Sequence, residues 1–150
     1  SDVLDLNWVQ LMNAYSCTEC GRCTNECPAN QTGKKLSPRK IMMDTRDRLE
    51  KVSLNISKNK GEFIDDGDRL LDNYISKEEL WACTSCNACV EACPINIDPL
   101  SIIMDMRQYL IMEESSAHPD LNNMMNNIEN NGAPWPYNQL DRELWAQETQ

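Results

Sequence analysis

The chain contains the stretch Cys17-Thr-Glu-Cys20-Gly-Arg-Cys23-Thr-Asn-Glu-Cys27-Pro28 and a second copy of its pattern, Cys83-Thr-Ser-Cys86-Asn-Ala-Cys89-Val-Glu-Ala-Cys93-Pro94. Both copies read C-x2-C-x2-C-x3-C-P, and together they contain all eight cysteines. Three thiolates at three-residue steps, on a loop that curls around an inorganic core, can hold three corners of an iron–sulfur cube. The pattern therefore predicts two [4Fe–4S] clusters.

The fourth cysteine of each run follows at a longer step. In two-cluster proteins with this run, that cysteine ligates the other cluster. We therefore expect cluster one on Cys17, Cys20, Cys23 and Cys93, and cluster two on Cys83, Cys86, Cys89 and Cys27. Such crossing would tie the two halves of the chain together, so the clusters would be part of the core.

Two other uses of the cysteines fit the pattern less well. Zinc prefers two separated pairs in a tetrahedral site, and it has no use for a third cysteine at the same step. A disulfide framework suits a short secreted chain, but nothing in this sequence resembles a signal peptide.

The composition is acidic and only moderately apolar. The net charge is −10 at pH 7, hydrophobic residues make up 41% of the 150 residues, and there is one Phe. A thin apolar core fits a single domain held together by its metal clusters. The negative charge argues against general binding to nucleic acid or anionic lipid. No stretch is apolar enough to span a membrane. The chain begins with Ser, so we expect a fragment of a longer protein.

Each cysteine run is preceded and followed by helix signals. We expect a short helix over about 3–15 and another from Ser76, with Glu79 completing a capping box. Ser37-Pro38 and Asp98-Pro99 begin two longer helices, with hydrophobic staples beside both caps. The match of Ile41-Met-Met-Asp44-x-Arg46 to Ile102-Ile-Met-Asp105-x-Arg107 indicates an internal repeat.

The repeat divides the chain into four parts. Half-units of about 1–52 and 75–112 would pack about a pseudo-two-fold axis, and a polar, loop-like connector over 53–74 would join them. A C-terminal helix from Pro119 and a rigid arm would fill 113–150. We therefore expect an all-α, alpha-helical ferredoxin fold around two clusters.

Several single residues carry narrower expectations. Gly21 and Asn87, at the same place in each loop, suit a left-handed backbone. Tyr15 and Trp81 would pack over the clusters and exclude water. The other expectations are His118 as a surface cap, and Met124 and Met125 as core residues.

A basic island in this acidic chain offers a possible docking patch. A solvated helix face is the more common meaning of such a run, and we favour it. The island consists of Lys34, Lys35, Arg39, Lys40, Arg46 and Arg48.

Beyond the cysteines, Ile75-Ser-Lys-Glu-Glu-Leu-Trp-Ala-Cys83, Met106-Arg-Gln-Tyr-Leu110 and Asn131-Gly-Ala-Pro-Trp135 resemble a known family. The chain is similar to the iron–sulfur domain of heterodisulfide reductase-like (Fe–S)-binding reductases. It is also similar to the glycolate oxidase and anaerobic glycerol-3-phosphate dehydrogenase iron–sulfur subunits, and more distantly to succinate dehydrogenase iron–sulfur subunits. The resemblance implies a helical ferredoxin whose two [4Fe–4S] clusters conduct electrons. In many members a cysteine-rich CCG domain follows at about the point where this chain ends.

The function that we expect is an electron-transfer module of a larger cytoplasmic oxidoreductase, with no catalytic site of its own. Its redox partner would be a protein or domain such as a CCG domain or a flavoprotein. The parent complex could lie at the cytoplasmic face of a membrane. The alternative is a redox-sensing or structural iron–sulfur module, but the chain offers no basic recognition helix and no incompletely ligated cluster.

Overall fold

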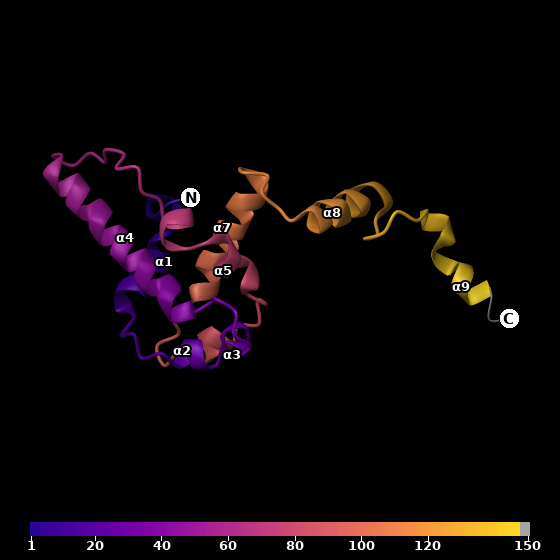
Figure 1. Cartoon of the computed structure of the whole chain (residues 1–150), viewed down its shortest axis with the longest axis horizontal. Coiled ribbons are helices and arrows are strands. Elements are labelled where there is room, and N and C mark those ends of the chain that lie inside the picture. Colours follow the sequence, from indigo (N-terminus) through magenta and orange to yellow (C-terminus); the bar gives the residue numbers. More distant parts are fainter. Residues whose placement is uncertain (148–150) are drawn as a thin grey trace. The chain divides into compact units, whose positions relative to one another are not determined.

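The structure is a computed structural model, and it describes residues 1–147 (Figure 1). These residues form helices and turns, with one isolated bridge between Leu71 and Ile75 and no strand. The predicted all-helical class is confirmed. The chain divides into two compact units, Ser1–Tyr109 and Leu110–Gln150, and all eight cysteines belong to the first.

The first unit contains the internal repeat that the sequence predicted. In each half a helix leads into the cysteine loop, a four-residue helix carries the third cysteine, and a longer helix follows. Figure 1 shows α2 and α3 at the end of the unit where α4 begins. The elements are η1 (Val3–Asp5), α1 (Trp8–Ser16), α2 (Arg22–Asn25), α3 (Pro28–Gln31), α4 (Pro38–Lys58), η2 (Leu70–Tyr74), α5 (Lys77–Ala82), α6 (Ala88–Glu91) and α7 (Pro99–Met112). The last three residues of α7 belong to the second unit.

The predicted caps are confirmed. Ser37 accepts a hydrogen bond from the Lys40 amide at the start of α4, and Asp98 accepts one from the Ser101 amide at the start of α7. Ser76 and Glu79 form the capping box of α5. The staple residues beside these caps are all buried; they are Leu36, Ile41, Ile75, Leu80, Ile97 and Ile102.

The first correction concerns the connector. α4 continues to Lys58, six residues into the segment predicted as a loop. The polar residues there do not break a helix, and the left-handed backbones of Lys60 and Gly61 come only after its end. Past the end of α4, the backbone of Ile64 forms two hydrogen bonds with the Asn55 side chain. The Asn55 amide donates to the Ile64 carbonyl, and the Asn55 side-chain oxygen accepts from the Ile64 N–H.

The helix predicted over about 3–15 is divided into η1 and α1, and the two aromatic residues of α1 are exposed. Trp8 is 73% exposed and Tyr15 is 51% exposed, whereas Gln10 and Ala14 are buried. Gln10 decides the orientation because its amide donates to Asp105 Oδ2 at 2.6 Å and its carbonyl accepts from the Asn7 amide. A polar residue with two good partners therefore faces inward beside Ala14, and the aromatic residues Trp8 and Tyr15 face outward.

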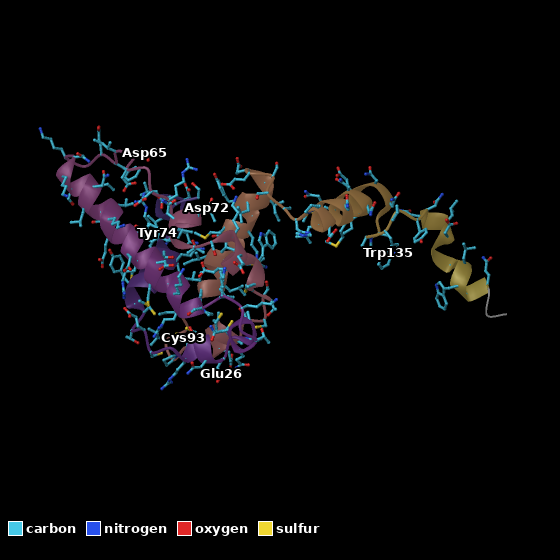
Figure 2. All side chains as sticks on the ribbon, in the orientation of Figure 1. Glu26, Asp65, Asp72, Tyr74, Cys93 and Trp135 are labelled. Atoms are coloured by element: carbon cyan, nitrogen blue, oxygen red, sulfur yellow. The ribbon has the colours of Figure 1, made fainter. Side chains whose placement is uncertain are left out.

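The second unit contains α8 (Pro119–Asn131), η3 (Gln139–Glu143) and α9 (Leu144–Gln147). As predicted, His118 caps α8, with Nδ1 accepting from the Asp120 amide, and Gly132 follows its end with a left-handed backbone. Within α8 no residue is buried, so the prediction that Met124 and Met125 belong to a core is wrong. Trp135, which is labelled in Figure 2, lines a hollow of this unit together with Tyr137.

Candidate metal centre

Both cysteine loops turn in the same way. Gly21 and Asn87 have φ values of 81° and 63°, which confirms the predicted left-handed position. Two residues earlier, Glu19 and Ser85 have φ values of 60° and 55°. The sequence did not predict this second left-handed position, because neither residue favours it. The shared geometry means that corresponding residues of the two loops can be compared directly.

The first set of cysteines meets in one pocket. Cys17, Cys20 and Cys23 line it from the first half of the repeat, and Cys93 lines it from the second. Figure 2 places Cys93 at the end of the unit that holds α2 and α3. The structure therefore brings together the four residues predicted for cluster one, across the two halves of the chain. Cys89, predicted for cluster two, also lines this pocket.

Part of the second set is also brought together. The pKa of Cys89 is raised to about 12, first by burial and then by the negative charge of the Cys83 and Cys27 thiolates. Cys27 of the first run therefore acts electrostatically on Cys89 of the second run, in the sense that crossing predicts. Cys86 is exposed, and the Ala88 amide helps to lower its pKa.

The pocket walls fit an iron–sulfur cluster. All the sulfur donors are cysteines, and Met42, Ile95 and Ile97 add apolar surface that excludes water. Backbone amides point at two of the sulfurs: the Ile97 N–H lies 3.3 Å from Cys93 Sγ, and the Ser85 N–H group donates to Cys83 Sγ at 3.4 Å. Such bonds stabilise a thiolate ligand and tune a cluster's potential.

Thiol protonation couples to metal loading. Burial raises the pKa of Cys23, and neighbouring cysteine thiolates raise it further. Buried thiols are therefore protonated at neutral pH, and their protons are displaced when metal binds. Across residues 1–147, no group of three or more Cys, His, Asp or Glu side chains is arranged to hold a metal ion. In a cube each thiolate binds its own iron atom, so its four donors are spread more widely than those of a single ion.

The aromatic residues before the two runs differ in their surroundings. Trp81 is partly buried, and the Arg107 guanidinium lies 5.1 Å from its ring centroid. Tyr15 is exposed and does not line the cysteine pocket, so it does not shield that site as predicted.

The basic island also needs correction. Arg48 is fully buried, and its guanidinium contacts the carboxylates of Asp2 and Asp66. Lys40 bonds to Asp44 and Glu79. Arg46 pairs with Glu19, and Lys35 pairs with Glu78. Four of the six cations are therefore engaged in ion pairs, and Arg48 does not belong to a solvated face because it is buried. Lys34, Lys35 and Arg39 are exposed, as the favoured interpretation of a solvated face predicts.

Fold and site define a class of protein. Residues 16–97 match the family model of the 4Fe–4S dicluster domain, and the chain belongs to this family. The two cofactors of the chain are accordingly two [4Fe–4S] clusters.

Particular relatives narrow the description. The chain is 33% identical to the probable iron-sulfur-binding oxidoreductase FadF of Bacillus subtilis, over 96% of this chain and 24% of that protein. It is 28% identical to the EtfAB:quinone oxidoreductase of Syntrophomonas wolfei, over 98% of this chain and 23% of the relative. It is 30% identical to a subunit of a CoB-CoM heterodisulfide reductase of Methanosarcina acetivorans, over 75% of this chain and 55% of the relative. The predicted resemblance to heterodisulfide reductase-like proteins is confirmed.

The chain spans about a quarter of the length of the first two relatives. In the part of the chain that the structure describes, no helix is long and apolar enough to cross a membrane.

Proposed function

We propose that this chain is the electron-relay module of a larger oxidoreductase of the heterodisulfide reductase-like type. Each cluster supplies one-electron chemistry, because it can gain and lose one electron without a proton. The observation that carries the proposal is the single pocket in which Cys17, Cys20 and Cys23 meet Cys93. Ligands from both halves in one place imply two adjacent clusters, which is the arrangement that a relay needs.

The ligand assignment is part of the proposal. Cluster one takes Cys17, Cys20, Cys23 and Cys93, and cluster two takes Cys83, Cys86, Cys89 and Cys27. The shared pocket supports the first set, and the influence of Cys83 and Cys27 on the pKa of Cys89 supports three members of the second. Cys89 also lines the pocket of cluster one, and this supports a short path between the clusters.

We propose the class of redox partner from the one-electron chemistry of the clusters and from the relatives. Relatives named as oxidoreductases and as part of a reductase support a redox protein or domain as donor or acceptor, such as a flavoprotein or a CCG domain. We place the module in the cytoplasm or at the cytoplasmic face of a membrane, because cluster-ligating thiols must stay reduced.

The test is anaerobic analysis of iron and acid-labile sulfide, with EPR spectroscopy before and after dithionite reduction. About eight irons and eight sulfides per chain, with reversible signals from two interacting reduced clusters, would support the relay. Zinc without sulfide would overturn it. Two clusters that cannot be reduced and reoxidised would favour a structural role instead.

A further inference from the structure

The two halves of the repeat place an arginine at the same point of each cysteine loop. Arg46 of α4 and Arg107 of α7 occupy matching positions, and so do Glu19 and Ser85 in the loops. Arg46 Nη2 lies 2.5 Å from Glu19 Oε1, and Arg107 Nη1 lies 3.4 Å from Ser85 Oγ. The geometry is repeated, but a carboxylate in one half is replaced by a hydroxyl in the other.

This replacement changes the local charge. Glu19 compensates the charge of Arg46. The hydrogen bonds that the structure gives for Arg107 go to the Leu80 carbonyl at 2.6 and 2.9 Å, to the Cys83 carbonyl and to Ser85, all of them uncharged. Arg107 is partly buried, so water screens its charge less than it would at an open surface.

The charges lie close to the expected ligands. Glu19 lines the same pocket as Cys17, Cys20 and Cys23, and Arg107 bonds directly to the backbone of Cys83. Because reduction adds one negative charge to a cluster, an uncompensated cation favours the reduced form and an ion pair does so much less.

A further cation, Arg39, favours the reduced form of cluster one and so opposes this difference between the clusters. Arg39 lines the pocket of cluster one, where its counterpart in the repeat is Leu100. Arg39 is exposed, so solvent weakens its effect, whereas bonds to the Cys83 carbonyl and to Ser85 hold Arg107 against the loop. Arg39 therefore reduces the difference between the clusters without reversing it.

We propose that the Glu19–Arg46 ion pair and the Arg107–Ser85 hydrogen bond set the two clusters at different potentials, with cluster two, at the Cys83 loop, the higher. This inference rests on the proposed relay with crossed ligands. A single electron then moves from reduced cluster one, which becomes oxidised, to oxidised cluster two, which becomes reduced. No proton or other reactant is needed.

The experiment is an EPR-monitored redox titration of the whole chain with both clusters loaded. Glu19→Ser should raise the midpoint of cluster one, and Ser85→Glu should lower that of cluster two. Each substitution should change the equilibrium constant for reduction of its cluster about tenfold, which is roughly 59 mV in the midpoint potential for one electron. The double variant Glu19→Ser/Ser85→Glu should narrow the difference between the two midpoint potentials or invert their order. Glu62→Ser, at an exposed position of the connector, is the control for net charge.

Two kinds of failure can be told apart. Iron and sulfide are measured on the same samples, and fewer than two clusters in the unaltered chain would refute the proposed relay. Two clusters whose midpoints shift no more in Glu19→Ser and Ser85→Glu than in Glu62→Ser would overturn this inference alone. If Glu19→Ser does not hold its clusters, Glu19→Gln removes the charge, retains an amide oxygen for Arg46, and should raise the same midpoint.

Discussion

Arg48 and Asp2 are joined by an ion pair that crosses 46 positions of the sequence, with Arg48 Nη2 and Nε both bonded to the Asp2 carboxylate, the former at 2.6 Å. On its other side the same guanidinium bonds to Asp66 at 2.6 and 2.9 Å and to the Asp68 carbonyl at 2.7 Å. One fully buried cation thus fastens the N-terminus and the connector to α4. Asp2 also accepts from the Leu70 amide, which extends the fastening to the core turn η2.

Replacing Arg48 should therefore destabilise the first unit. Arg48→Met keeps much of the side-chain volume but leaves two carboxylates facing each other without their shared cation. We expect a loss of about 3 kcal/mol, because one partner of a buried pair is removed. The measurement is the temperature at which the visible absorbance of the clusters disappears under anaerobic heating. Lys34→Met, at an exposed lysine, should change stability by no more than about 0.5 kcal/mol.

The ion pair also predicts a pH dependence. The bond from Arg48 lowers the pKa of Asp66 below its ordinary value. A carboxyl with a lowered pKa in the folded state stabilises that state above its unfolded pKa of about 3.9. This contribution is lost as the pH falls through the folded-state pKa.

The stability difference between the unaltered chain and Asp66→Asn should therefore be constant from about pH 8 to 6 and shrink below about pH 4. Urea unfolding of both loaded proteins at each pH measures it, and the acid sensitivity of the clusters largely cancels in the difference. Asp65→Asn is the matched control, because the hydrogen bond that Asp65 accepts comes from the Gly67 amide and not from an arginine. A stability difference that grows on acidification would contradict the lowered pKa of Asp66.

Local signals in the sequence predicted local features well. Ser37, Asp98 and the Ser76–Glu79 box each act within three residues, so the sequence alone identifies them as caps. The cysteine spacing likewise predicts the loop, because the cluster chemistry allows few alternatives.

Features that depend on distant partners could not be predicted in this way. Nothing near Arg48 indicates that it is buried, because Asp2 and Asp66 reach it only in the folded chain. In α1, the exposure of Trp8 and Tyr15 follows from the inward contact of Gln10 with Asp105, a residue 95 positions away. The charge difference between Glu19 and Ser85 is visible in the sequence, but its meaning appears only with the positions of Arg46 and Arg107.

The left-handed backbone at Gly21 predicts an order of substitutions. A Cβ there would lie 4.0 Å from Arg39 Nη1, an ordinary contact, so the cost comes from the positive φ and not from a clash. Gly21→Asn should be the mildest change, since Asn87 has the same conformation in the other loop. Gly21→Ala should cost about 1 kcal/mol, and Gly21→Val should cost more.

The rate at which an iron chelator removes iron anaerobically should follow the same order, with the Gly21→Asn protein close to the unaltered chain. Asn87→Gly is the reciprocal control, and we expect it to leave the rate nearly unchanged. Equal rates for Gly21→Asn and Gly21→Val would show that the backbone conformation of this loop does not limit cluster retention.

Crossed ligation predicts which cluster each fourth cysteine supports. Because Cys93 lines the pocket of Cys17, Cys20 and Cys23, Cys93→Ser should damage cluster one although it lies in the second run. Cys27→Ser should damage cluster two. Each variant should keep about four irons, and EPR spectra of the reduced proteins identify the survivor. Cys20→Ser and Cys86→Ser are the references, since each belongs to the first three cysteines of its run. The spectrum of Cys93→Ser should match that of Cys20→Ser, and a match to Cys86→Ser would mean that each run ligates its own cluster.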